Sequence, residues 1–261
     1  MHTRGIRKHR HSTGRQPAVD PRERALLRAD WDELLMVHFA VTPEAIQARV
    51  PQPLDTRDGE AFVTLVAFRQ RQLRFDRPGR WARALARPVD EHAFLNVRTY
   101  VRGPQGPGIW FMREFINNPL ARLAGPLLYG LPYRLAAMRY RHRPPTRHYA
   151  ARVSGLKERL SIEADYALAP LPAADVGSLE QFLHERYVAY TGRGRRSRRF
   201  RVWHEPWRMH RARARIEANG PAFDWMGDAR PLAAFFTPGM KNLGLGGPVA
   251  EPYVERQKDR T

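Results

Sequence analysis

The sequence of 261 residues contains no cysteine. This absence excludes disulfide bonds, a thiol nucleophile and a metal site with thiolate ligands. It does not by itself fix the cellular compartment.

Acidic residues and lysine are also scarce. Asp and Glu number 26 against 45 Lys and Arg, which gives a formal net charge of +19. Lysine occurs only at Lys8, Lys157, Lys241 and Lys258, so nearly all of the positive charge is arginine. Such a charge attracts nucleic acid, acidic membrane surfaces or anionic substrates. It is also compatible with a charged surface that only contacts solvent. We favour the solvated surface, because the shortage of lysine indicates a compositional bias of the whole chain.

Long hydrophobic runs are absent as well. The N-terminus lacks the apolar segment of a secretory signal, and no stretch reaches about 18 uninterrupted apolar residues. We therefore predict a cytoplasmic protein without a membrane span. Residues 1–25 are predicted to form a disordered basic arm, residues 26–250 a single domain and residues 251–261 a flexible tail.

Short strand patterns dominate what is present. Apolar or alternating segments predict strands at residues 31–41, 61–70, 94–103, 108–115, 133–143, 149–155, 159–168, 187–191, 200–218 (broken at Pro206) and 231–240. Residues 69–90 are strongly basic and are expected to be irregular. Because strands and helices do not alternate regularly, we predict an α+β fold built on a largely antiparallel, β-barrel-like sheet.

Three short helices are expected between these strands. Thr42 followed by Pro43 indicates one helix start, and Asn118 before Pro119 indicates another, with Pro126 kinking or ending its first part. Ser178 and Gln181 have the spacing of a capping box, which predicts a third helix.

The hairpin of residues 94–103 and 108–115 places polar side chains where a core is expected. Alternation puts Asn96, Arg98 and Tyr100 on one face of the first strand. On the second strand it groups Trp110 and Met112 with Glu114.

The pairing of this hairpin predicts an ion pair. Arg98 directly opposite Arg113 would bring like charges together, whereas a shift of one residue brings Arg98 beside Glu114. We therefore expect an Arg98–Glu114 pair on the face shared with Tyr100, Trp110 and Met112. Its role stays open between a buried pair that fixes register, an arginine that holds a substrate carboxylate with Glu114 as acid or base, and an exposed pair.

Sequence motifs for other kinds of functional site are weaker or absent. His184 and His204 each stand beside a glutamate, but no paired-histidine metal motif exists, so we expect structural histidines, no metal and no cofactor. The sequence also lacks the G-x-G-x-x-G phosphate motif and the G-x-S-x-G nucleophile motif. The arginine-rich cluster at residues 192–204 is interpreted as an exposed hairpin tip rather than a site for single-stranded nucleic acid.

Several segments together resemble a known family. "WDELLMVHFAV", "VPQPLD", "NVRTYV", "GIWFMREFINNPLARLAGPLLYGLPYRLAAM", "FLHERYVAYT", "VWHEPW" and "FFTPG" follow one another between residues 26 and 250. In this succession the chain resembles the uncharacterised bacterial YqjF-like family, DUF2071. That family is similar to the acetoacetate decarboxylase-like fold, a barrel-like α+β domain with an internal pocket.

The resemblance implies a pocket but no established activity. Acetoacetate decarboxylase uses a Schiff-base lysine activated by an adjacent lysine. This chain has no lysine pair, and neither Lys157 nor Lys241 stands in a matching motif, so Schiff-base chemistry is not expected. Tyr187 and His204 stand at recurrent positions of the family's motifs and are further pocket candidates.

The leading hypothesis is an internal pocket for a small organic acid, with or without a lyase-type reaction. We expect Arg98, Asn96, Tyr100, Trp110 and Tyr187 to bind the ligand, and Glu114 or His204 to handle protons.

The alternatives are a basic accessory protein that binds nucleic acid or another polyanion, and a structural module whose inward polar residues satisfy one another. A homo-oligomer is compatible with each hypothesis.

Overall fold

The computed structural model describes residues 24–77, 87–192 and 196–251. Almost all of the predicted basic arm, almost all of the predicted C-terminal tail and residues 193–195 of the arginine-rich cluster lie outside these ranges. None of the helices in the described ranges is long and apolar enough to cross a membrane.

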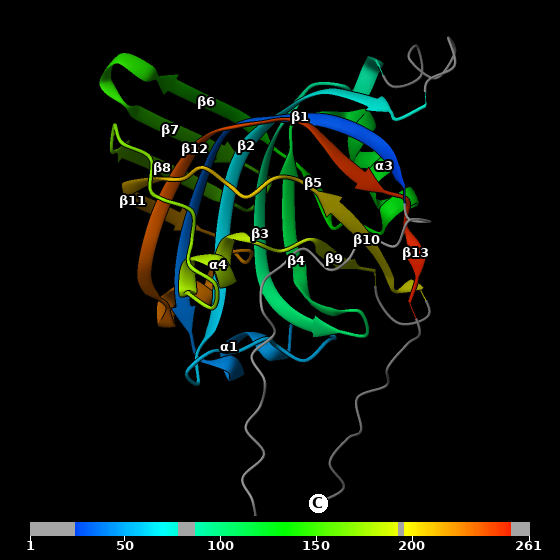
Figure 1. The fold of residues 1–261 in the computed structure, drawn as a ribbon, viewed down its shortest axis with the longest axis horizontal. Helices are drawn as coiled ribbons and strands as arrows, with labels where there is room; N and C mark the ends of the chain where they lie inside the picture. Colours follow the sequence, from blue (N-terminus) through cyan, green and yellow to red (C-terminus); the bar gives the residue numbers. More distant parts are fainter. Residues whose placement is uncertain (1–23, 78–86, 193–195, 252–261) are drawn as a thin grey trace, which may run out of the picture.

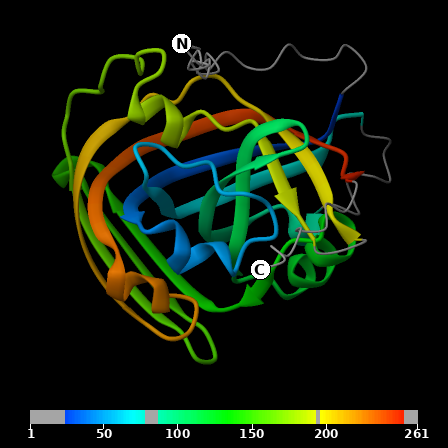
Figure 2. The ribbon, with the colours of Figure 1, turned by 90° about the horizontal axis from the view of Figure 1, so that it is seen from below.

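Seven strands close into a ring, which Figure 2 shows nearly end-on. The ring closes at β10, which pairs with both β9 and β12. All neighbours in the ring are antiparallel except the parallel pair of β4 and β9. The ring strands are β1 (Ala25–Val41), β2 (Ala61–Phe75), β3 (His92–Gly103), β4 (Gly106–Ile116), β9 (Val188–Thr191), β10 (Arg198–Trp203) and β12 (Arg230–Gly246).

A second layer continues from β12 and covers the outside of the ring (Figure 1). Its antiparallel strands, in order from β12, are β11 (His210–Asn219), β8 (Arg159–Tyr166), β7 (His148–Ser154) and β6 (Ala137–Arg143). Two short strands extend the sheet elsewhere, β5 (Tyr133–Leu135) beside β4 and β13 (Val249–Ala250) beside β10. The predicted α+β, largely antiparallel and barrel-like architecture is confirmed.

The helices are few and short. They are α1 (Pro43–Gln47), α3 (Pro119–Tyr129) and α4 (Leu179–His184), with 3₁₀ turns at Arg87–Val89, Pro144–Thr146 and Asp224–Asp228.

The helix starts follow the expected capping chemistry. Asn118 accepts hydrogen bonds from the Leu120 and Ala121 amides at the start of α3. Ser178 accepts from the Gln181 amide at the start of α4. α3 continues through Pro126 to Tyr129, so of the two expected effects of this proline the ending of the helix does not occur.

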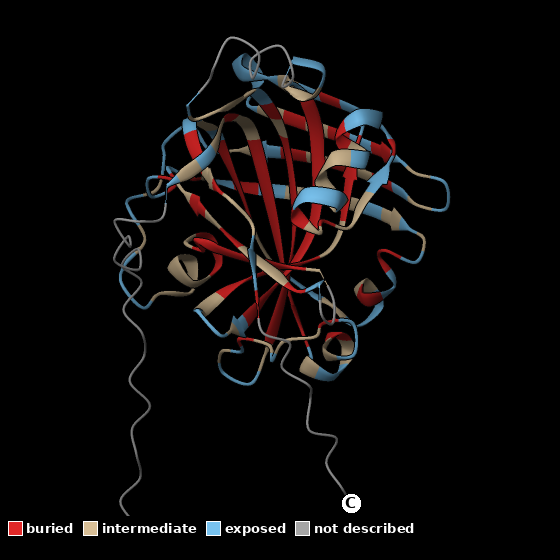
Figure 3. Cartoon of the chain, turned by 90° about the vertical axis from the view of Figure 1, so that its right-hand side faces the viewer, coloured by how far each residue is buried: buried red, intermediate tan, exposed pale blue. Residues whose placement is uncertain are grey.

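The central strands are buried on both faces, as Figure 3 shows. Alternate residues of β1 enter two different cores. Leu34 and Met36 pack inside the ring, whereas Leu35 and Val37 pack between the ring and the outer layer. The ring interior is therefore a compartment separate from the core beneath the outer layer.

Three strands are clearly longer than the sequence pattern predicts, and β1 begins at Ala25 rather than at residue 31. β2 runs to Phe75, through a segment expected to be irregular, because Leu27 and Arg28 of β1 pair with Phe75 and Arg74. β12 likewise runs to Gly246 along β1. Pairing with a neighbour, rather than local composition, sets the ends of these strands.

Candidate functional site

A cavity of about 490 Å³ occupies the ring interior. At one end of the ring, Phe182 of α4 packs against the rings of Phe62 and Tyr100, with centroids 5.5 and 5.3 Å away. The polar residues that line the cavity are Gln70, His92, Asn96, Arg98, Glu114, Tyr129, Tyr133, His184, Arg186 and His204, together with the indoles of Trp31 and Trp207.

β3 directs Asn96 and Arg98 into this cavity by simple alternation. Arg98 is only 8% exposed. Its Nη2 lies 3.8 Å from the Met36 sulfur, and its Nε has no hydrogen-bond partner. Asn96 is 7% exposed, and its Oδ1 also has no partner.

A β-bulge in β4 decides which side chains face Arg98. Val97 pairs with Arg113 but Arg98 pairs with Phe111, so Met112 is an extra residue in the ladder. Beyond it the faces exchange, which turns Phe111 inward with Glu114 and turns Trp110 outward. The predicted grouping of Trp110 and Met112 with Glu114 was therefore wrong, because strict alternation fails at the bulge.

The predicted ion pair is also wrong, since no ion pair or hydrogen bond joins Arg98 to Glu114 in the described structure. Glu114 lies opposite Asn96 and is 3% exposed, and its Oε2 has no partner. Burial raises the pKa of Glu114 well above its ordinary value. Burial therefore favours the neutral form of Glu114, which can donate a hydrogen bond into the cavity.

A directed chain of hydrogen bonds leads to the buried pair His38 and His184. The Tyr100 hydroxyl donates to the Leu183 carbonyl at 2.9 Å, so it accepts from Thr64 at 2.7 Å. Thr64 in turn accepts from Nδ1 of His38 at 2.8 Å. The unprotonated Nε2 of His38 then accepts a hydrogen bond from Nε2 of His184 at 3.3 Å. The chain fixes the tautomers of both rings.

Arg98 acts electrostatically on the histidines around it. Burial, with Arg98 contributing, lowers the pKa of His184 to about 3 and that of His204 to about 4. The pKa of His38 is lowered by burial, by His184 and by Arg98. These imidazoles are thus neutral near pH 7, and the guanidinium is held among uncharged groups.

Arg186, the other arginine of the cavity wall, is paired with a buried carboxylate. Its Nη1 lies 2.7 Å from Oδ2 of Asp55, whose Oδ1 receives Arg102 at 2.6 Å. The Arg186 guanidinium also lies over the Phe182 ring, 4.0 Å from the centroid. This cluster anchors α4 and leaves Arg186 with little need for a ligand.

Four of the seven predicted site residues line the cavity: Asn96, Arg98, Glu114 and His204. His204 donates from Nδ1 to the Glu205 carbonyl at 2.7 Å and lies between the rings of Tyr187 and Trp207, tilted against both.

The other three predicted residues lie outside the cavity wall. The Tyr100 hydroxyl belongs to the hydrogen-bond chain beneath the cavity. The Tyr187 hydroxyl donates to Glu185. Trp110 packs outside the ring with Val101 and Tyr190.

Sequence reasoning did not assign several polar wall residues to the site, among them His92, His184, Tyr133 and Arg186. Alternation along β3 extends to His92 and could have found it. His184 and His38 are 146 positions apart, and no local pattern brings them together.

The wall has no lysine among its described residues. Lys241 lies on the surface, 66% exposed, with its Nζ 2.8 Å from Asp32. Lys157 lies in the exposed turn between β7 and β8. In the described ranges no group of three or more His, Asp or Glu side chains is placed to hold a metal ion.

Comparison with known proteins identifies a family and a relative of this chain. Residues 28–241 match the family DUF2071, described as an uncharacterized conserved protein. The uncharacterized protein YqjF of Bacillus subtilis (strain 168) is 31% identical over 199 residues, which cover 74% of this chain and 79% of YqjF.

Solved structures share the fold at low sequence identity. Acetoacetate decarboxylase from Legionella pneumophila superposes with a TM-score of 0.65 and 13% identity, over 87% of this chain and 88% of that one. The enduracididine biosynthesis enzyme MppR complexed with pyruvate gives a TM-score of 0.53 and 13% identity, over 88% and 89% of the chains. The protein thus has an acetoacetate decarboxylase-like fold, and it belongs to the DUF2071 family.

Proposed function

We propose that the protein binds a small organic acid inside the ring, with the ligand carboxylate on the Arg98 guanidinium. Neutral Glu114 and the Asn96 amide flank this position as hydrogen-bonding groups. His204 and His184 complete the polar part of the wall.

One observation carries the proposal. Four side chains of the same cavity, each at least nine-tenths buried, have a polar atom without a hydrogen-bond partner: His92, Asn96, Arg98 and Glu114. A buried polar group without a partner costs about 1–3 kcal/mol, and more if it is charged. Since four such groups meet in one cavity, a polar ligand supplies the missing partners.

The charge balance of the wall favours an anion. Among the described lining residues, Arg186 is paired with Asp55, burial favours the neutral form of Glu114, and the histidines are neutral. Arg98 is left as a buried cation without a counter-ion. A carboxylate matches the fork of a guanidinium and offers two acceptors to its donors.

The fold comparison supports the same class of ligand, because MppR has been crystallised with pyruvate, a short keto acid. For any reaction, the cavity offers acid–base groups rather than a nucleophile. Glu114 can donate a proton to a bound acid, and His184 or His204 can accept one. A lyase-type step here would proceed without a Schiff base, since the described wall has no lysine.

The test is thermal unfolding with a panel of small carboxylic and keto acids. A ligand that binds only the folded state raises the melting temperature. The variant is Arg98→Gln, and the matched control is Arg152→Gln, an arginine 71% exposed on β7. Primary alcohols of the same length as the acids serve as ligands without charge.

We expect at least one acid to stabilise the wild type and the Arg152→Gln control, and not Arg98→Gln. The matching alcohol should have no effect. Failure of every acid to stabilise the wild type would refute the proposal, and so would equal stabilisation of Arg98→Gln.

A second candidate function rests on the outer layer. Its exposed arginines include Arg139, Arg141, Arg152, Arg211, Arg213 and Arg215, on β6, β7 and β11. Arg139 lies directly opposite Arg152, an unfavourable pairing that a bound polyanion would relieve. The N-terminal arm, which this alternative function would also use, lies almost entirely outside the described residues.

This second function is tested by fluorescence anisotropy with a labelled single-stranded oligonucleotide at rising salt concentration. Binding should weaken steeply with salt, and Arg139→Gln combined with Arg152→Gln should reduce the magnitude of the slope of log affinity against log salt by about 1.4. Binding without a salt dependence, or an unchanged slope in the double variant, would eliminate this face as a polyanion site.

A further inference from the structure

We infer that the acid bound at Arg98 carries an extended apolar tail, which runs along the ring interior toward the end where α3 lies. This inference rests on the proposed function, and it specifies the class of ligand more narrowly. The Arg98 end of the cavity determines the head group, and the opposite end determines the tail.

The polarity of the wall changes along the ring. On β3, Arg98 and Asn96 are followed toward the strand start by Phe94. On β1, Met36 contacts Arg98, and nine positions earlier Leu27 pairs with Phe75 of β2 and Leu245 of β12. Apolar side chains also come from outside these strands, namely Val89, Ala121, Ala124, Leu128 and Pro248.

The exposure of the wall changes in the same direction. Met36 and Val66, near Arg98, are 1% and 2% exposed. Leu26 and Leu128, at the other end, are 43% and 55% exposed although both line the cavity. The cavity therefore opens to solvent at its apolar end, so a ligand enters there and its charged head travels inward to Arg98.

The dimensions exceed the needs of a short acid. Arg98 and His92 are six residues apart on β3, which corresponds to about 20 Å of strand. A volume of about 490 Å³ accommodates roughly sixteen groups the size of a water molecule. A short keto acid would occupy the polar end and leave most of the aromatic and aliphatic wall uncovered.

The outer wall also disfavours a polar tail. Gln70 is already engaged, because its Oε1 accepts from the Trp31 indole at 3.3 Å. The Tyr129 hydroxyl donates to the Gly246 carbonyl at 3.1 Å. Of the described polar atoms at this end, only Nδ1 of His92 is buried without a partner. A tail with several polar groups would therefore lose water here and gain one partner in return. An apolar tail gains affinity from the same surface.

The experiment is a titration of the full-length chain with acetate, butyrate, hexanoate, octanoate and decanoate. Binding is followed by tryptophan fluorescence, since Trp31 and Trp207 line the cavity, and by calorimetry. Each buried methylene should improve affinity about fourfold until the tail reaches the opening. Phenyl-terminated acids of matched length compare a flat tail with a flexible one.

A pair of variants on α3 tests where the tail lies. Ala124 lines the cavity near its opening, so Ala124→Trp should block the outer part. We expect it to weaken decanoate binding at least tenfold and to leave butyrate binding within about twofold of the wild type. The matched control, Leu123→Trp, adds its bulk at a position of the same helix that is 63% exposed and not part of the wall.

The outcomes separate this inference from the proposed function. If short acids bind through Arg98 but affinity does not rise with chain length, the apolar-tail inference is overturned and the proposed function stands. If no acid of any length binds, the proposed function fails as well. Equal loss of long-chain binding in Ala124→Trp and Leu123→Trp would also overturn the assigned position of the tail.

Discussion

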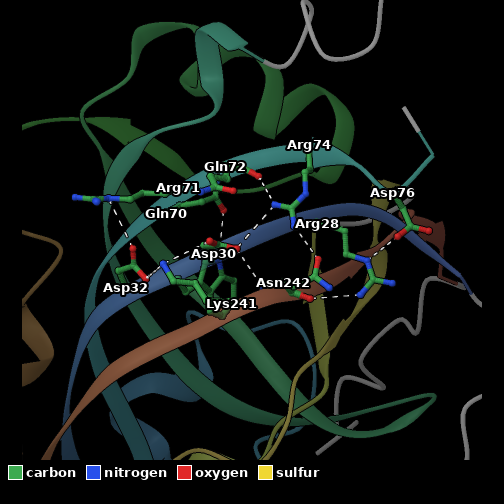
Figure 4. A network of polar contacts seen from close by, with 11 residues as sticks. Arg28, Asp30, Asp32, Gln70, Arg71, Gln72, Arg74, Asp76, Lys241 and Asn242 are labelled. Atoms are coloured by element: carbon green, nitrogen blue, oxygen red, sulfur yellow. Dashed lines mark hydrogen bonds and ion pairs between the residues drawn. The ribbon is translucent and has the colours of Figure 1, made fainter. Parts of the chain in front are cut away.

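The charged residues of the ring fall into two groups. Among the described residues, those on its outer surface form ion pairs with one another, and Arg98 and Glu114 inside it do not. On its outer surface, where β1, β2 and β12 meet, acids and bases form the continuous network shown in Figure 4. Arg28 Nε lies 2.6 Å from Asp76, Lys241 Nζ lies 2.8 Å from Asp32, and Asp30 accepts from the Asn242 amide at 2.9 Å. Inside the ring, the polar atoms of Arg98 and Glu114 have no such partners.

This difference shows where the fold needs polar residues and where it does not. The surface network lies at bulges of β1, near the positive-φ residues Gln72 and Asn242, so its contacts hold together strands that bend. The interior groups stabilise nothing in the fold that an apolar residue would not stabilise equally well. Paired charges here support the structure, and the unpaired buried groups are those that the proposed ligand would contact.

The largest effect is expected where a buried pair is broken. Asp55→Asn removes the counter-ion of Arg186 and leaves a buried guanidinium uncompensated. We expect the free energy of unfolding to fall by about 3–5 kcal/mol, measured by urea denaturation. A loss below about 1 kcal/mol, typical of an exposed pair, would contradict the buried pairing.

The next effect depends on pH and concerns Glu114. Its raised pKa means that the folded protein keeps a proton which the unfolded chain loses above about pH 4.5. The wild type therefore loses stability as pH rises from 4.5 toward the pKa of the folded state, by up to about 1.4 kcal/mol per pH unit. Glu114→Gln cannot titrate, so its stability advantage should grow over this window.

The measurement for Glu114 is chemical denaturation of both proteins at a series of pH values. Below pH 4.5 the two stabilities should differ by a constant amount, because both side chains are then neutral in both states. Parallel stability curves across the whole range would show that Glu114 is ionised in the folded protein.

A smaller effect, opposite in sign to the destabilisation by Asp55→Asn, is expected at Arg98. Arg98→Met removes a buried cation without a counter-ion, so in the absence of ligand the variant should be more stable than the wild type by about 1 kcal/mol. The same variant should lose acid binding by roughly a hundredfold. A destabilised Arg98→Met that still binds acids would assign Arg98 to the structural group instead.

The smallest effect is expected in the surface network. Lys241 is 66% exposed, and its pairs with Asp30 and Asp32 are screened by water and salt. Lys241→Met should cost no more than about 0.5 kcal/mol, and less at high salt. Denaturation in low and in high salt measures both numbers, and a salt-independent loss would point to packing of the lysine stem rather than charge.

The sequence predicted the fold class, the family and part of the cavity wall. Alternation along one strand was enough to group Asn96 with Arg98, because β3 is regular there. The bulge at Met112 could not be predicted, since nothing in the local sequence marks one extra residue in a ladder. The consequence was a wrong face for Trp110 and an ion pair that does not form.

Contacts between elements that are distant in the sequence could not be predicted from local patterns either. His38 and His184 meet only because α4 covers the end of the ring, and the end of β2 is set by pairing with β1 rather than by its own composition. Local patterns describe one strand at a time, whereas a cavity wall is assembled from many.

The closure of the ring has a consequence for how the chain reaches its native state. β1 needs β12 as a neighbour, and their contact between Asp30 and Asn242 joins residues 212 positions apart. Until β12 has been synthesised and docked, β1 has one unpaired edge and apolar side chains on both faces. We expect slow folding, with late intermediates that aggregate through this edge and are captured by chaperones.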